Sequence, residues 1–343
     1  YIISKSVDFC RKQVLKKAMM KSVPLLNKCS FEEIEKLISD ALRLGISNDH
    51  GYDYIKDFEA RFIERARNPV TTGWTKIDKI TKGGLGQGEL VVVVAPTGAG
   101  KSHVLVHLGA QALKQGKNVV HFTLELADTS VAQRYDACLT GIPLDELINQ
   151  KDEVYNVIKD IDGQLIVKEF PTKSASVVTL KNHLEKIRQT EMEIDMIVVD
   201  YGDLLKSSVV RKNSEKRHEL ESIYEELRGL GQEFGCPIVT ASQTNRKGLN
   251  EEVITMESIS EAFNKCFVAD FIISLSRTIK DRNANIARIF VAKNRNGPDG
   301  IVFSAFMDTS SVSIKVLERD DVVKLQQQQL AKQQQKEFSK ARE

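Results

Sequence analysis

Short apolar runs alternate with longer stretches of helical periodicity between about residue 70 and residue 320. Several of these runs are almost wholly apolar, as expected for central strands covered on both faces of a sheet. This alternation predicts an α/β fold with a mostly parallel, twisted sheet flanked by helices. The last two runs are separated by a turn-rich segment, 294–300, which suggests a terminal antiparallel hairpin. The runs interpreted as strands are Leu90–Ala95, Val119–Leu124, Leu165–Phe170, Met196–Asp200, Pro237–Ser242, Phe271–Ser276, Ile286–Ala292 and Val302–Asp308.

The pattern divides the chain into three zones. Residues 1–68 are expected to be a helical N-terminal remnant, residues 69–320 the α/β domain, and residues 321–343 a Gln-rich, low-complexity tail that is helical or disordered. The clearest helix of the first zone spans about residues 30–44 and begins at Ser30 with an S-x-x-E capping box. Its apolar stripe has to pack on something, either its own core or a neighbouring subunit.

Composition bounds what such a chain can do. With 343 residues, 41% of them apolar and 28% charged, it can form one large α/β domain and a smaller element. The formal net charge of +2 means that a nucleic-acid ligand has to be held by local basic loops. The five scattered cysteines argue against a disulfide framework or a structural metal and fit a reducing cytosol. No apolar run approaches the ~18 residues of a membrane span. No signal peptide is present, and the chain opens on Tyr1, which suggests a fragment whose N-terminal domain is missing.

The strongest chemical signal is the segment Ala95–Ser102, A-P-T-G-A-G-K-S, which lies between a predicted strand and a helical stretch. It matches the P-loop pattern G-x-x-x-x-G-K-[ST], except that Ala95 takes the first position. Small residues let backbone N–H groups close around phosphate oxygens, and the following helix aims its positive end at the anion. Lys101 is expected to reach the β- and γ-phosphates, and Ser102 to hold Mg²⁺. The predicted nucleotide-binding residues are Pro96, Thr97, Gly98, Ala99, Gly100, Lys101 and Ser102.

Three further polar residues stand at the ends of predicted strands, where sheets of this type place their ligands. Asp200 ends an apolar strand as a Walker B acid does, and such an acid can hold the Mg²⁺ shell through water. Glu125 follows another strand, where a carboxylate can polarise the attacking water as a general base. Gln243 follows a third and can sense the γ-phosphate. Each residue also has an alternative without a role in catalysis: Asp200 as the cap of a turn, Glu125 as an exposed surface residue, and Gln243 as an amide that does not contact the nucleotide.

Taken in order, these motifs resemble those of the DnaB-type replicative helicase family over about residues 70–308. The resemblance implies a RecA-like P-loop core preceded by an N-terminal helical linker segment. Residues 52–66 and 80–84 further resemble the replicative helicases of large tailed phages. The segments that carry the family resemblance are Thr72–Asp78 with Gly83–Leu85, Phe122–Glu125, Val199–Tyr201, Ser242–Arg246 and Ala292–Pro298.

Carried over residue by residue, the resemblance implies catalytic roles. Glu125 would be the general base, Asp200 the Mg²⁺ acid and Gln243 the γ-phosphate sensor. Lys293 and Arg295 would project into the nucleotide site of the neighbouring subunit, where a cation stabilises charge in the transition state. The alternative for these two residues is a surface hairpin with exposed cations.

The resemblance also implies the ligands and the assembly. It implies a hexameric ring that uses ATP or another NTP with Mg²⁺ and moves along single-stranded DNA. It further implies a primase and a helicase loader as partners, and a cytoplasmic location, in the host if the protein is phage-encoded. The lack of a long apolar run separately predicts no membrane partner. Arg134 stands where the family has an Arg that faces the nucleotide, or it is a solvent-exposed helical residue. Ser260 and Phe263 depart from the family pattern, which often has Arg and Gly there. The residues of the candidate DNA-binding loops are Arg246, Lys247, Ser260, Glu261, Asn264 and Lys265.

Three functional hypotheses remain. The leading one is an ATP-dependent replicative DNA helicase. The second is a RecA-type recombination or repair ATPase that forms filaments on DNA, and the basic hairpin at residues 293–298 favours the helicase over it. The third is a non-enzymatic loading module. Such a module would not need Glu125, which argues against it.

Overall fold

The computed structural model describes residues 2–26, 33–34, 37–38, 41, 54–56, 58–59, 68–207, 216–244, 253–254 and 267–318. The chain divides into two compact units, residues 1–66 and 67–343. The first unit contains helix α1 (Ile2–Leu26), with Pro24 in its last turn. Most of the helix expected over residues 30–44, and all of the Gln-rich tail, lie outside the described residues.

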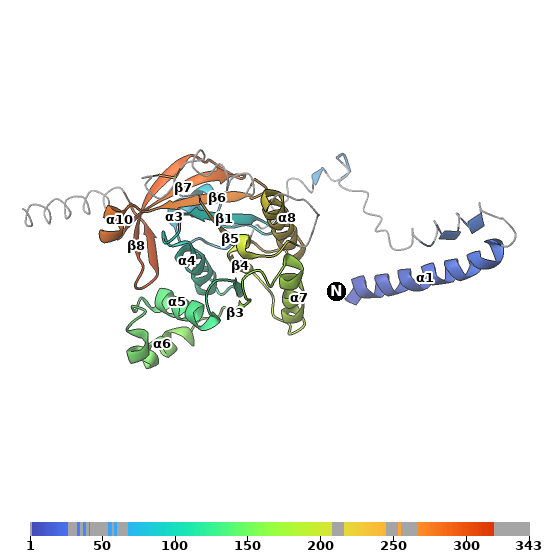
Figure 1. Ribbon diagram of the computed structural model, residues 1–343, viewed down its shortest axis with the longest axis horizontal. Helices are drawn as coiled ribbons and strands as arrows, with labels where there is room; N and C mark the ends of the chain where they lie inside the picture. The colour runs from blue at the N-terminus through green and yellow to red at the C-terminus, as the bar shows by residue number, and fades with distance from the viewer. Residues whose placement is uncertain are drawn as a thin grey trace, which may run out of the picture. The chain divides into compact units, whose positions relative to one another are not determined.

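The second unit is built on one nine-stranded sheet of order β3-β2-β4-β5-β1-β6-β7-β8-β9 (Figure 1). Strands β1 to β6 are parallel to one another, and the pairs β6–β7, β7–β8 and β8–β9 are antiparallel. The predicted α/β class and mostly parallel sheet are therefore confirmed. The strands are β1 (Leu90–Ala95), β2 (Val119–Thr123), β3 (Leu165–Glu169), β4 (Met196–Asp200), β5 (Ile238–Gln243), β6 (Phe271–Ser276), β7 (Ile286–Asn294), β8 (Ile301–Asp308) and β9 (Ser313–Val316).

Helices cover both faces of this sheet, and the alternation of side chains along β1 explains why. Val91 and Val93 point into one apolar core with residues of α4, whereas Leu90, Val92 and Val94 point into the other with residues of α7 and α8. Successive side chains of a strand point to opposite faces, so a central strand with helices on both sides is apolar throughout. The helices are α3 (Thr75–Ile80), α4 (Lys101–Lys114), α5 (Asp128–Thr140), α6 (Lys151–Ile158), α7 (Val177–Arg188), α8 (Lys216–Phe234) and α10 (Ile279–Asn283), with short 3-10 turns η2 (Leu147–Gln150) and η3 (Gly202–Leu204).

The terminal hairpin is present as β7 and β8, which pair antiparallel from Ile286↔Phe306 to Val291↔Ile301. Strand β7 runs two residues beyond the predicted run, to Asn294. Strand β9 was not predicted. It is four residues long, and only one of them, Ile314, is buried. The strict alternation of apolar and polar residues from Val312 to Val316 is the short signal that could have predicted it.

The entry to this unit is tied to its far end by a buried tryptophan. The indole N–H of Trp74 donates to the carbonyl of Ile314, 3.0 Å away. The ring stacks on His107 of α4, with ring centroids 4.7 Å apart. The same histidine also contacts the segment before the tryptophan, because His107 Nε2 lies 3.1 Å from the carbonyl of Thr72. The Thr72–Asp78 motif therefore has a structural role at the start of the domain.

Two histidines in this unit are fully buried and neutral. Burial lowers the pKa of His107 to about 4, against the opposing effect of its bond to Thr72. Burial lowers the pKa of His121 on β2 still further, to about 3, and Arg134 adds to the shift. His121 Nδ1 lies 3.0 Å from the hydroxyl of Tyr135. A buried imidazole that cannot take up a proton makes the folded state sensitive to acid.

We expect the free energy of unfolding to fall as the pH drops from about 7.5 to about 5. The folded pKa of His107 lies below the ordinary value of 6.5, so the unfolded chain binds a proton at a higher pH than the folded chain. Protonation therefore stabilises the unfolded state as the pH falls. Each buried histidine should cost roughly 1–2 kcal/mol over this interval. The measurement is denaturant unfolding followed by circular dichroism at both pH values.

The variant His107→Gln keeps a donor for the Thr72 carbonyl but does not titrate, so it should lose less stability in acid than the unchanged protein. His218→Gln is the matched control, because His218 is exposed and its side chain is 65% accessible. A loss in His107→Gln equal to that of the unchanged protein would contradict the assignment.

Candidate active site

The phosphate loop connects β1 to α4 at the carboxyl edge of the sheet. Lys101 is the first residue of α4, and Gly100 caps the helix with a left-handed backbone conformation, at φ 108°. A side chain there would also meet Met307, because a Cβ on Gly100 would lie 2.2 Å from the methionine Cε. The amide of Ala99 donates to the carbonyl of Pro96 at 3.2 Å, which closes the loop. Backbone N–H groups and the helix terminus thus face the position where P-loops hold phosphate.

Asp200 ends β4 beside this loop and is almost completely buried, with 1% of its surface exposed. No donor in the described part of the chain meets either carboxylate oxygen with hydrogen-bond geometry. Burial raises its pKa to about 6. The hydroxyl of Ser102 lies close enough to oppose this shift, as do the more distant cations Arg134 and Lys101. A buried carboxylate that no donor meets with full hydrogen-bond geometry is costly, which is consistent with a site for a ligand.

Glu125 is exposed just beyond the end of β2, on a turn that neighbouring groups hold in place. The Thr123 hydroxyl donates to the carbonyl of Leu126 at 2.8 Å and accepts from its amide at 3.1 Å. The Thr172 hydroxyl donates to the carbonyl of Leu124 at 2.7 Å. The amide of Leu124 in turn donates to the carbonyl of Asp200 at 2.8 Å. These bonds fix the backbone on both sides of Glu125.

The cations Lys101 and Arg134 lie within the field of the same acids. Burial lowers the pKa of the Lys101 amine, and the charges of Glu125, Asp200 and Asp203 oppose that shift. Its ammonium lies 5.6 Å from the centre of the Tyr201 ring. Burial also lowers the pKa of Arg134, and Asp200 and Glu125 oppose it. Arg134 is half-buried on α5. The structure therefore brings these sequence-predicted residues together.

Gln243 ends β5, the strand next to β1, and it reaches across to the phosphate loop. Its side-chain amide donates to the hydroxyl of Thr97. Its side-chain oxygen accepts from the hydroxyl of Tyr201 at 3.5 Å, and its backbone amide lies 3.4 Å from a carboxylate oxygen of Asp203. Tyr201 and Asp203 were not predicted as site residues. They follow Asp200 closely in the sequence, which is the only signal that could have pointed to them.

Lys293 and Arg295 lie at the opposite edge of the sheet. The register pairs Asn294 of β7 with Phe271, and Phe271 with Val91 near the start of β1. The phosphate loop follows the other end of β1, and a six-residue strand is about 20 Å long. The two cations are therefore not brought to the phosphate loop of their own chain.

A buried carboxylate holds Arg295 at this edge. Asp270 accepts from the Arg295 guanidinium at 2.7 Å and from Nε and Nη2 of Arg228, both at 3.1 Å. It also accepts from the amide of Leu90 at 3.1 Å. The Lys293 ammonium donates to the carbonyl of Phe267 at 2.7 Å. Asp270 and Arg228 were not predicted, because no local pattern brings them together.

Hydrogen bonds hold the turn after β7 against the rest of the domain. The side-chain amide of Asn294 donates to the carbonyl of Ile80 at 3.0 Å, and that of Asn296 donates to Glu89 at 2.8 Å. A Cβ on Gly297 would lie 2.2 Å from the Ile80 carbonyl oxygen, so glycine is needed there. These contacts fix the backbone of the basic hairpin, residues Lys293–Pro298, relative to the sheet.

All six residues predicted to contact DNA lie outside the described residues, namely Arg246, Lys247, Ser260, Glu261, Asn264 and Lys265. Across the described part of the chain, no group of three or more acidic, His or Cys side chains could hold a metal ion by itself. The helices described there include none long and apolar enough to cross a membrane.

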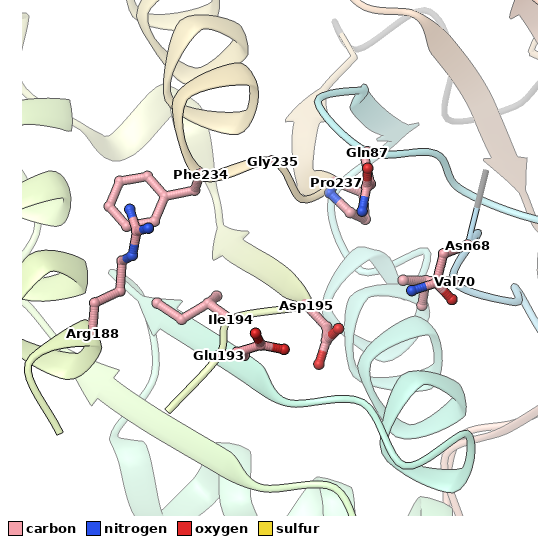
Figure 2. A pocket seen from close by; sticks show the side chains of 10 residues that line it. All are labelled: Asn68, Val70, Gln87, Arg188, Glu193, Ile194, Asp195, Phe234, Gly235 and Pro237. Carbon is pink, nitrogen blue, oxygen red and sulfur yellow. The ribbon is translucent and has the colours of Figure 1, made fainter. Parts of the chain in front are cut away.

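A pocket of about 260 Å³ lies elsewhere (Figure 2). Among its lining residues, Asp195 and Pro237 directly precede β4 and β5, which places the pocket at the amino edge of the sheet. Figure 2 shows Arg188 beside the ring of Phe234 on one side, and the guanidinium lies 5.3 Å from the centre of that ring. The pocket is therefore separate from the phosphate loop.

The sheet order and the phosphate loop, with its strand-end acid and amide, define the class of P-loop NTPases with a RecA-like core. The chain belongs to the DnaB-like helicase C-terminal domain family, which matches residues 69–337. The family resemblance of the sequence is thus confirmed.

Named relatives agree with this assignment. The chain is 30% identical over 278 residues to the DnaB-like replicative helicase of Enterobacteria phage T4, covering 77% of this chain and 58% of that protein. It is 24% identical over 344 residues to the replicative DNA helicase DnaB of Mycoplasma genitalium, covering 90% and 72%. The chain thus spans little more than half the length of the phage relative.

Solved structures agree on the fold. One of them, a separately solved ATPase domain, matches with a TM-score of 0.64 at 17% identity, covering 76% of this chain and 95% of that one. A DnaB-like replicative helicase, described with its interactions with primase, matches with a TM-score of 0.66 at 17% identity, covering 88% and 76%.

Proposed function

We propose that this chain is the motor of an ATP-dependent replicative DNA helicase, a hexameric ring that moves on single-stranded DNA and unwinds duplex at the replication fork. The observation that carries the proposal is the division of one catalytic set between two edges of a sheet. Lys101, Asp200 and Glu125 lie at the carboxyl edge, and Arg295 is fixed at the amino edge. A subunit arranged in this way needs the edge of a neighbour to complete its site, and a closed ring supplies one to every subunit.

The bound ligand is proposed to be ATP or another NTP with Mg²⁺. The donor set fits: the Ser102 hydroxyl and the unpartnered Asp200 carboxylate lie beside the loop that would hold the phosphates. Mg²⁺ takes few protein ligands and keeps waters and phosphate oxygens, so no acidic cluster is needed. When bound, the ion would neutralise charge on the phosphates.

Hydrolysis is proposed to run through this chain's own groups. Glu125 accepts a proton from the attacking water as general base, held in position by the turn that Thr123 closes. Lys101 and the loop amides bind the phosphates, with Arg134 facing the nucleotide. Gln243, which bonds to Thr97 of the loop, senses the γ-phosphate.

The remaining parts of the proposal concern assembly and partners. Lys293 and Arg295 act on the nucleotide of the adjacent subunit. The loops holding Arg246, Lys247, Ser260, Glu261, Asn264 and Lys265 bind the DNA backbone. Residues 1–68 form a helical linker region, 69–320 the motor and 321–343 a tail. Primase and a helicase loader are proposed partners, and a neighbour by fold is described with primase. The proposed location is the cytoplasm, that of the host if the gene is a phage's.

The alternatives receive less support. The family match and the named relatives are replicative helicases, and none favours a RecA-type filament former. A loading module without catalysis would not need a carboxylate held as Glu125 is. The pairing of a buried acid with an exposed one at the phosphate loop therefore favours an enzyme.

The first prediction of this proposal concerns ATP hydrolysis with and without single-stranded DNA, alongside particle mass with a non-hydrolysable analogue. We expect strong stimulation by DNA and a mass near six chains. Glu125→Gln should keep nucleotide binding but halt turnover, because the water loses its base, and Lys101→Ala should abolish binding. Hydrolysis by a monomer at a rate that DNA does not change would contradict the proposed motor function. A wild-type rate in Glu125→Gln would contradict the assignment of Glu125 as general base.

A second prediction tests the shared site. Arg295→Ala should bind nucleotide normally and lose DNA-stimulated hydrolysis by roughly 10³-fold, the scale of trans-acting cations in other NTPases. Asp270 keeps its Arg228 partner, so the fold should survive. Mixing Arg295→Ala with Lys101→Ala protein should restore part of the activity, since some interfaces pair an intact loop with an intact Arg. A wild-type rate for Arg295→Ala alone would contradict the role.

A third prediction follows from the raised pKa of Asp200, about 6 before the ion binds. Mg²⁺ binds the carboxylate form, so its binding must expel a proton below that pH and should weaken up to about tenfold per pH unit. Mg²⁺ titrations with a non-hydrolysable triphosphate between pH 7.5 and about 5 measure this effect. Asp200→Asn reports the contribution of the nucleotide's own titration. If both proteins showed the same pH dependence, Asp200 would not be the Mg²⁺ acid.

A further inference from the structure

The connection from β6 to β7 brings a second arginine against the phosphate loop, on the side away from β5. Strand β6 pairs with β1 in parallel, so it ends at the edge that carries the loop. Helix α10 follows it after two residues. A Cβ placed on Gly98, in the middle of the loop, would lie 3.8 Å from the Arg282 guanidinium. Arg282 therefore lies beside the element proposed to bind phosphate.

The backbone that carries Arg282 is firmly anchored. Thr278 and Asp281 form a reciprocal capping box at the start of α10. The Asp281 carboxylate also binds the guanidinium of Arg288 on β7 at 2.6 Å. Hydrogen bonds from Thr278 and Arg288 hold the pKa of Asp281 below its ordinary value despite burial. A short helix fixed at both of these points presents its next residue in a constant place.

No carboxylate in the described part of the chain forms an ion pair with Arg282. Its side chain is exposed. A second cation, Arg277, lies near it, and the charge of Arg282 contributes to lowering the pKa of Arg277, after burial. The charges of Asp281 and Asp308 oppose that lowering of the Arg277 pKa. Two cations near each other still repel, and an anion bound beside Arg282 would relieve that repulsion.

We propose that Arg282 is a further nucleotide-binding residue, which contacts the polyphosphate chain of the nucleotide held by its own subunit. This inference rests on the proposed function, because it concerns the same site. The phosphate loop would then be flanked on both sides, by Gln243 at Thr97 from β5 and by Arg282 at Gly98 from β6. A guanidinium matches phosphate oxygens in geometry and charge.

The test is the dissociation constant of a fluorescent diphosphate nucleotide with Mg²⁺, measured on the full chain with adenine and guanine forms. Arg282→Ala should weaken binding about tenfold for both bases, the scale of one lost charge-assisted contact. Arg282→Lys should recover part of the loss, because the charge remains. Lys280→Ala is the matched control, since Lys280 is exposed on the same helix, and it should change binding less than about twofold.

Three outcomes would overturn the inference. Unchanged binding by Arg282→Ala would show that the guanidinium does not reach the phosphates. An equal loss in Lys280→Ala would reduce the effect to general surface charge. A loss confined to one base would place the contact at the base instead of the polyphosphate. The absence of nucleotide binding by the unchanged protein would overturn the proposed function as well, so the two failures are distinguishable.

Discussion

The parallel pairing of β1 with β5 on one side and β6 on the other is the constraint on which the site depends. All six residues of β1 are buried, and the strand pairs in parallel with both of these neighbours. Parallel strands deliver their carboxyl ends to one edge, where ligands of such sheets bind. The phosphate loop, Gln243 and the connection carrying Arg282 are therefore neighbours because of strand order.

The burial of Asp200 lowers the stability of the fold and places a carboxylate at the proposed Mg²⁺ site. Removing a carboxylate from water without partners costs several kcal/mol unless it takes up a proton, which the raised pKa reflects. Strand β4 is buried and apolar up to Asp200, and β1 is buried and apolar throughout, so burial of these strands offsets the cost. Glu125, in contrast, stays exposed on a turn, so two carboxylates a short way apart have different surroundings. Environments that differ in this way separate the roles of acids within one site.

Sequence patterns captured the local parts of this arrangement and missed the contacts made across strands. Strands β1, β4 and β6 begin and end where the apolar runs do, because each run is buried on both faces. Lys101, Asp200 and Glu125 could be predicted as site residues because their motifs are local. Asp270 and Arg282 could not be found in that way. Asp270 and Arg282 lie near β1 because β6 pairs with it. The periodicity of a strand indicates which residues are buried, but it does not indicate which strand lies beside it.

Strand β1 also links the two halves of the proposed catalytic set within one subunit. At its amino end, the Leu90 amide bonds to Asp270, which holds Arg295; at its carboxyl end, it becomes the phosphate loop. Glu89, the residue before the strand, binds Asn296 of the basic hairpin. A single, fully buried strand between these contacts leaves few soft dihedrals to absorb a displacement. If Arg295 engages a neighbour's nucleotide as proposed, a shift of the hairpin is passed to the start of the strand that carries this subunit's own loop. A ring built from such subunits would have each nucleotide site joined mechanically to the next, and the joint would be one six-residue strand.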